Sequence, residues 1–137
     1  MNWQRILKYV FILWAVTFSI AFVFGALTSV LQEEGSAIPV WLRLVQLVAV
    51  LAASTAVFAT LAYRQSERPL SHALLVLLIA SLSALPINVF FGQTVAQWAL
   101  SNIFGLITAA AGVGLGVALR KWRTTAASHS IPETNVS

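Results

Sequence analysis

The chain has 137 residues, of which 59% are hydrophobic and only 9% are charged. Soluble domains carry about 25% charged residues, so this composition excludes a soluble globular domain and a disordered chain. The absence of Cys also excludes a small secreted domain held together by disulfides. The composition therefore predicts an integral membrane protein.

Long stretches without charged residues define the expected membrane spans. Residues 9–32 and 44–63 each fit one helix, because a spanning helix needs roughly 20 apolar residues. Residues 73–119 as one helix would measure about 70 Å, far beyond a hydrocarbon core of about 30 Å. This stretch must fold back, and the Gly-Gln-Thr cluster at 92–94 is the expected turn.

The expected fold is an all-α membrane protein in which four transmembrane helices form a compact bundle. The expected helices are residues 6–31, 39–63, 71–91 and 95–119. Residues 1–123 then form the transmembrane domain. Residues 124–137 are small and polar, and we expect them to be a disordered cytoplasmic tail.

The first expected helix has the basic start of a signal peptide. Its apolar run is about twice the usual length of a signal h-region, and no clear A-x-A cleavage site follows it. We therefore expect a retained span, with signal cleavage as the alternative.

Seven of the eight basic residues fall on one side of the expected membrane. They are Arg5, Lys8, Arg64, Arg68, Arg120, Lys121 and Arg123. Only Arg43 falls on the other side, so the positive-inside rule places both termini in the cytoplasm. From the compact, Ala- and Leu-rich chain without Cys, we expect a bacterial plasma (inner) membrane. Because the basic residues flank the spans, the net charge of +4 does not indicate nucleic-acid binding.

Small residues recur along two of the expected helices, and in lipid such residues let helices pack closely. The expected packing face consists of Gly105, Ala109, Gly112 and Gly116 on the fourth helix and Ala49, Ala52 and Ala56 on the second. Two interpretations are open. The favoured one is packing within the bundle, and the other is a homo-oligomer or contact with a larger membrane-protein partner.

Aromatic residues follow a different pattern from the small ones. The first helix carries a bulky ridge at helical spacing, made of Phe11, Trp14, Phe18 and Phe22. We expect this ridge to fill a groove in the bundle or to face lipid. Trp98 is expected at the outer membrane interface, because amphipathic rings favour the headgroup zone.

Polar residues gather in the expected outer half of the bundle. They are Gln46, Asn88, Gln97 and Asn102. Pro86 lies inside the third helix, where it removes one backbone N–H and predicts a kink beside Asn88. An ordinary kinked helix end is the favoured interpretation, and a functional polar site is the alternative.

The sequence shows no residue pattern typical of a catalytic, metal or cofactor site. Glu33 and Glu34 fall on the outer side, and Glu67, His72, His129 and Glu133 fall on the inner side. A bilayer about 30 Å thick separates the two groups, so they are not expected to converge on one metal or substrate. We therefore expect no catalytic residue, no metal and no cofactor, and an enzyme is the least expected class.

Two functions remain after these exclusions. The favoured one is a small structural or accessory membrane protein that acts through helix packing, with itself or with a larger membrane complex. The alternative is a small transporter or pore for a neutral solute, which uses the polar residues of the outer half with Pro86 as a hinge. Small multidrug transporters share the four-helix size, but they need a membrane-embedded Glu in the first helix, and residues 6–31 contain no acid.

Overall fold

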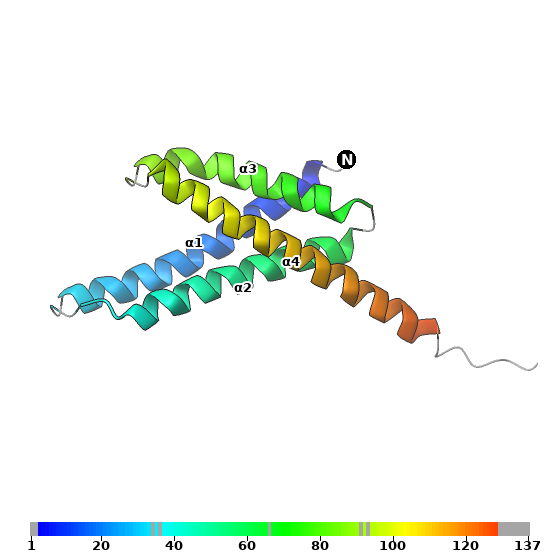
Figure 1. The fold of residues 1–137 in the computed structure, drawn as a ribbon, viewed down its shortest axis with the longest axis horizontal. Coiled ribbons are helices and arrows are strands. Elements are labelled where there is room, and N and C mark those ends of the chain that lie inside the picture. Colours follow the sequence, from blue (N-terminus) through cyan, green and yellow to red (C-terminus); the bar gives the residue numbers. More distant parts are fainter. Residues whose placement is uncertain are drawn as a thin grey trace, which may run out of the picture.

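The computed structural model describes residues 3–33, 35, 37–65, 67–90, 92 and 94–128. In this part of the chain there are four helices and no strand: α1 (Trp3–Glu33), α2 (Val40–Arg64), α3 (Pro69–Phe90) and α4 (Val95–Ser128). Each helix is long and apolar enough to cross a membrane. The expected all-α fold of packed, membrane-spanning helices is thus confirmed (Figure 1).

The helix ends follow from the local sequence. Pro39 precedes α2 with extended backbone, and its carbonyl accepts a hydrogen bond from the N–H of Leu42 at 3.1 Å. Pro69 is the first residue of α3, a position where a missing N–H has no consequence. Gly35 and Gly92 have φ angles of 70° and 74° in the turns after α1 and α3, which glycine adopts without strain.

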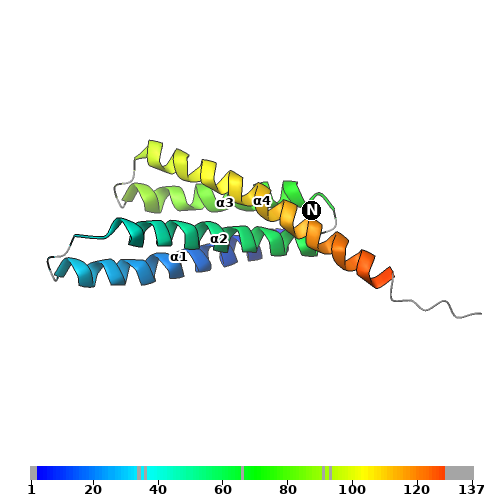
Figure 2. The same cartoon turned by 60° about the horizontal axis from the view of Figure 1, so that its bottom comes forward.

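The end of α4 differs from the expectation. The helix continues to Ser128, so the expected disordered tail is wrong for residues 124–128, whereas residues 129–137 lie outside the described part. The hydroxyls of Thr124 and Thr125 donate to the carbonyl of Lys121 at 2.8 and 3.1 Å. Extending an existing helix needs no new nucleus, so polar residues continue it beyond the other helices (Figure 2).

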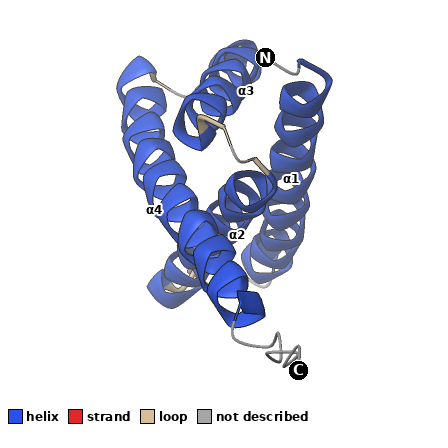
Figure 3. Cartoon of the chain, turned by 90° about the vertical axis from the view of Figure 1, so that its right-hand side faces the viewer, coloured by secondary structure: helices blue, strands red, loops and turns tan. Residues whose placement is uncertain are grey.

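The helices form two hairpins, α1 with α2 and α3 with α4, which diverge toward one end of the bundle (Figures 1 and 2). We call this end, where the α1–α2 and α3–α4 connections lie, the open end. The opposite end, with the start of α1 and the α2–α3 connection, is the basic end. Seen from the basic end, α2 lies between α1 and α4 (Figure 3), and those two helices do not pack against each other over their described residues.

The hydrophobic core lies toward the basic end and the middle of the bundle. Its largest buried side chains are Ile6, Tyr9 and Leu13 of α1, Phe58 and Leu61 of α2, Val76 of α3 and Val113 of α4. Many of the other large apolar side chains are exposed, as expected for helices surrounded by lipid. The half of the bundle nearer the open end therefore contributes few side chains to the core.

α2 and α4 form the most extensive helix pair, and two glycines of α4 lie at their contact. A Cβ added at Gly112 would lie 2.6 Å from the carbonyl oxygen of Thr55, and one added at Gly116 would lie 2.3 Å from that of Ala59. Only glycine permits such a close approach of two backbones. α2 thus occupies the part of the expected packing face of α4 at Gly112 and Gly116, next to the fully buried Ala109, whereas Gly105 of the same expected face lies against Leu77 of α3.

The contact face of α2 differs from the expected one. Ala52 and Ala56 are exposed and Ala49 is half-buried, whereas the glycines of α4 face Thr55 and Ala59. The centres of the two faces lie roughly 75° apart around the helix, at about 100° per residue. The prediction of the three alanines as the face that packs inside the bundle is therefore wrong, because α2 carries small residues on several sides and size alone does not select one.

Candidate functional site

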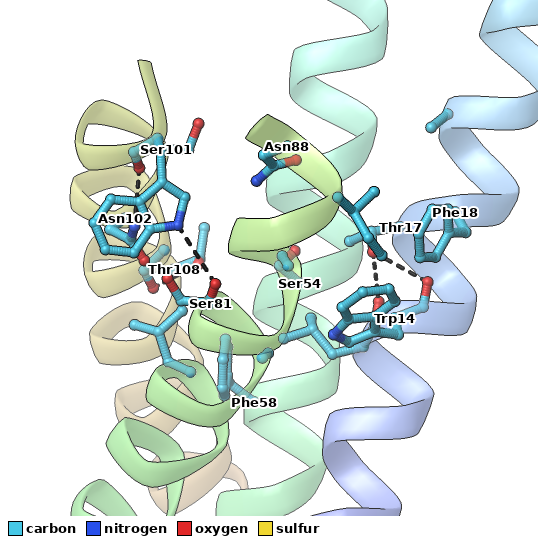
Figure 4. Close-up of a pocket in the computed structure, with 18 residues that line it drawn as sticks. Trp14, Thr17, Phe18, Ser54, Phe58, Ser81, Asn88, Ser101, Asn102 and Thr108 are labelled. Atoms are coloured by element: carbon cyan, nitrogen blue, oxygen red, sulfur yellow. Dashed lines mark hydrogen bonds between the residues drawn. The ribbon is translucent and has the colours of Figure 1, made fainter. Parts of the chain in front are cut away.

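A cavity of about 430 Å³ lies between the two hairpins, with walls from α1, α2, α3 and α4 (Figure 4). Its volume lies within the range of about 300–1,000 Å³ typical of ligand pockets. The hairpins diverge toward the open end, and the core leaves this half of the bundle unfilled. The cavity is thus a direct consequence of the fold.

The cavity extends from near the open end to the middle of the bundle. Asn88, which lines it, lies in the last turn of α3. Thr108, which also lines it, lies about 20 Å along α4 from the start of that helix at Val95. Toward the basic end the cavity meets Leu13 and Phe58, which belong to the buried core. The cavity therefore ends blindly in the middle of the bundle.

Several polar side chains on the cavity wall, Asn88 and Ser54 among them, have no hydrogen-bond partner within the described residues. The amide of Asn88 is half-buried, and the hydroxyl-bearing side chain of Ser54 is only 8% exposed. Asn102 donates through Nδ2 to the carbonyl of Trp98 at 2.8 Å, which leaves its Oδ1 as an acceptor. These groups face the cavity with unused hydrogen-bonding capacity, so they can bind a ligand or water that offers the complementary donor or acceptor.

Three other hydroxyls on the wall, those of Thr17, Ser101 and Thr108, bond to carbonyls of their own helix. Thr17 donates to the carbonyls of Leu13 and Trp14, and Thr108 donates to that of Gly105 at 2.9 Å. None of the described residues that line the cavity is ionisable. The wall is therefore apolar, with a few neutral hydrogen-bonding groups.

Trp14 and Phe18 form an aromatic wall on the α1 side of the cavity. Their ring centroids are 4.9 Å apart, with the ring planes tilted by 44°. The same two side chains line an apolar groove of about 410 Å³ that also includes Leu7 and Phe11 of α1 and Ser83 of α3. The pair thus stands between the cavity and the lipid-facing groove.

The structure brings together only part of the expected polar cluster. Asn88 and Asn102 line the same cavity, whereas Gln46 and Pro86 do not. Gln97 is exposed and instead caps α4, because its Oε1 accepts the N–H of Thr94 at 2.9 Å and its own N–H donates to the Thr94 hydroxyl at 3.3 Å. This is a capping box, whose T-x-x-Q pattern is readable in the sequence.

Pro86 does not interrupt α3, which remains helical to Phe90, and the proline is exposed. Ser54 and Ser81 line the cavity although no sequence pattern singled them out, and Trp98 was expected at the membrane interface. Trp98 is half-buried, lines the cavity, and donates from its indole nitrogen to the carbonyl of Ser81 at 3.4 Å. No sequence signal separates these side chains from the many other Ser and Trp residues.

Comparison with known proteins assigns no family to the chain. No family model, no curated protein and no solved structure matches it. Among the described residues, no three His, Cys, Asp or Glu side chains come together in a group that could hold a metal ion. The cavity between the hairpins is therefore the candidate functional site.

Proposed function

We propose that this chain is a small multi-pass membrane protein whose cavity binds a small neutral amphiphile. Such a ligand is mostly apolar and carries at least one carbonyl, hydroxyl or amide group. The observation that carries the proposal is the presence of unpartnered polar groups, above all Asn88 and Ser54, on the wall of a cavity without ionisable residues. The proposal narrows the alternative function expected from the sequence, a small transporter or pore for a neutral solute, to the binding of such a solute.

The chemistry of the wall selects the ligand class. An ion in this cavity would lose its hydration without gaining a charged partner, which is strongly unfavourable in an apolar site. The Asn88 amide offers both a donor and an acceptor near the open end, and the Ser54 hydroxyl offers the same deeper in the bundle. The rings of Trp14 and Trp98 supply apolar surface for the rest of the molecule.

The proposed orientation places the basic end in the cytoplasm of a bacterial cell, in accordance with the positive-inside rule. The cavity then lies in the outer half of the membrane, with the open end outward. Leu13 and Phe58 close it toward the cytoplasm. A permanently open pore is therefore disfavoured, and any transport requires the hairpins to move relative to each other.

Photolabelling tests the proposal with a neutral probe, 4-(hydroxymethyl)benzophenone, added to the protein in lipid nanodiscs. We expect mass spectrometry to locate the label mainly on residues of the cavity wall. Asn88→Leu removes the hydrogen bond to the probe and lowers labelling about fivefold, since one hydrogen bond contributes about 1 kcal/mol. Gln46→Leu removes an amide that does not line the cavity and leaves labelling unchanged.

The opposite pattern would reject a binding cavity. Label spread along exposed side chains such as Phe11 and Phe22, with no change in Asn88→Leu, would mean that the probe only partitions into lipid around the bundle.

A second candidate function is the expected accessory role, which the exposed Ala52 and Ala56 favour. The glycines of α4 do not support it, because α2 already covers Gly112 and Gly116. The exposed alanines leave a side of α2 on which another membrane helix can pack. Extraction of the protein in a mild detergent should then recover a partner. The double variant Ala52→Leu with Ala56→Leu should lose this partner, while the unfolding midpoint of the bundle stays unchanged. A partner retained by this variant would exclude this face as the contact.

A further inference from the structure

A separate cleft of about 310 Å³ lies at the basic end, where the start of α1 meets the end of α2. It is lined by Gln4, Arg5, Lys8, Tyr9 and Arg64. No acidic residue belongs to this lining, and neither Lys8 nor Arg64 forms an ion pair with a described residue. The cleft therefore gathers three cationic side chains, of which Arg5 also donates a hydrogen bond to the Oε1 of Gln65.

The lining determines which ligand the cleft can accept. Lys and Arg are donors only, and the Gln4 amide and Tyr9 hydroxyl also have hydrogens to donate. Tyr9 is only 5% exposed and belongs to the core, so the cleft has a fixed apolar base. An anion with several acceptor oxygens suits this arrangement, and a phosphate group forms charge-assisted hydrogen bonds with both Lys and Arg.

The outward face of α1 connects this cleft, which lies against α2, with the apolar groove beside α3. Gln4, Lys8, Phe11, Ala15 and Phe18 recur at steps of three and four residues, so they share one face of the helix. The first two line the cleft, and the last three line the lipid-facing groove beside α3. Phe11 is 75% exposed, so this face is open to the hydrocarbon of the bilayer.

We propose that the cleft and the groove together bind one anionic phospholipid from the leaflet at the basic end. Its phosphate lies between Lys8 and Arg64, and one acyl chain follows Phe11, Ala15 and Phe18. The groove favours a lipid over free phosphate, because a soluble anion would use only the charged part of the site. This lipid site is distinct from the cavity between the hairpins and does not depend on it.

Native mass spectrometry tests the site with phosphatidylglycerol and with phosphatidylcholine added to the intact protein. We expect one retained phosphatidylglycerol per chain and weaker retention of phosphatidylcholine. Lys8→Gln with Arg64→Gln should weaken phosphatidylglycerol binding by about 10- to 30-fold, since each cation near an anionic lipid surface contributes on the order of 1 kcal/mol. Arg43→Gln with Lys121→Gln removes the same charge outside the cleft and should leave binding unchanged.

Two further measurements distinguish the phosphate of a bound lipid from free phosphate. Dihexanoyl phosphatidylglycerol, with short chains, should bind more weakly than the long-chain lipid, and millimolar inorganic phosphate should not displace the long-chain lipid. Full displacement by inorganic phosphate would overturn the lipid assignment. Equal losses in the two double variants would overturn the site altogether, because they would show a response to net charge alone.

A single variant tests the site even where the double variant unfolds. Lys8 is exposed and its side chain has no hydrogen-bond partner among the described residues, so Lys8→Gln alone should preserve the unfolding midpoint. It should still weaken phosphatidylglycerol binding by about fivefold. Unchanged binding in this folded variant would contradict the proposed contact.

Discussion

Polar side chains cap two helix ends by hydrogen-bonding to backbone groups that have no partner in the helix. Thr94 and Gln97 satisfy each other's backbone N–H groups at the start of α4. At the end of α2, the guanidinium of Arg120 donates to the carbonyls of Gln65 at 2.6 Å and Ala62 at 3.4 Å. The last carbonyls of a helix have no partner in the helix itself, so a cation from α4 both satisfies them and opposes the helix dipole.

Thr94→Ala should lower the free energy of unfolding by about 1 kcal/mol, the usual contribution of an N-cap hydroxyl. Gln97→Ala should have a similar but smaller effect, and neither change should alter probe labelling of the cavity. Denaturant unfolding in detergent, followed by circular dichroism, measures the first result. Reduced labelling in Gln97→Ala at unchanged stability would show instead that this amide belongs to the ligand site.

Arg120→Met should destabilise the bundle, because it leaves the carbonyls at the end of α2 without their cationic donor. We expect a loss of about 1 kcal/mol, below the 1.5–3 kcal/mol typical of charged hydrogen bonds, since the side chain is half-exposed. Lys121→Met is the matched control, because Lys121 is exposed and its side chain makes no hydrogen bond with a described residue. The same denaturant series compares the two, and equal losses would mean that charge rather than capping is responsible.

At the scale of helices, the contact of α2 with α4 determines how the two hairpins cross. Gly112 and Gly116 bring the two backbones together, and the neighbouring Gly114 faces open space. Three glycines of the same short segment therefore have different roles, which allows a test within one helix.

Gly116→Ala should force the helices apart, because its Cβ would lie 2.3 Å from a backbone oxygen that no side-chain rotation can move. We expect a loss of at least about 1–3 kcal/mol, the range for overpacking. Gly114→Ala should be neutral or stabilising by about 0.5–1 kcal/mol, since alanine favours the helix. Thermal unfolding in detergent measures both, and similar midpoints for the two variants would exclude the close packing of α2 and α4.

The sequence predicts helices better than it predicts their contacts. The apolar stretches place every described helix start and end within three residues, apart from the end of α4. The α4 glycines are found because a Gly-x-x-x-Gly pattern has a specific meaning in lipid. The matching face of α2 is not found, because small residues lie on several sides of the helix, Ala53, Ser54, Ala56 and Ala62 among them, and only the crossing of the helices chooses one side.

For the whole molecule, the main feature is the separation of a packed half from an unfilled half. The core residues lie toward the basic end and the middle, and the cavity occupies the half where the hairpins diverge. The sequence indicates that Asn88 and Asn102 share this half, but not that Ser54 joins them. The two asparagines lie on α3 and α4 and Ser54 lies on α2, so their meeting depends on tertiary packing that no local pattern encodes.

The aromatic pair of Trp14 and Phe18 offers a route into the cavity from the lipid. Both rings line the cavity on one side and the outer groove on the other. Phe18→Ala should therefore speed entry of the benzophenone probe, because it removes part of the wall without touching Asn88 or Ser54. Labelling of the cavity as a function of time measures this, and an unchanged rate would point to entry from the open end alone.

Cysteine accessibility tests the central claim, the cavity itself, most directly, because the chain has no Cys of its own. Ser54→Cys places a thiol on the cavity wall, and Ala73→Cys places one in the packed core. In membranes, we predict that neutral N-ethylmaleimide modifies the thiol of Ser54→Cys at least tenfold faster than the thiol of Ala73→Cys. A cationic methanethiosulfonate reagent should modify the thiol of Ser54→Cys much more slowly than the neutral reagent does. Equal, slow modification at both positions would contradict an accessible cavity between the hairpins.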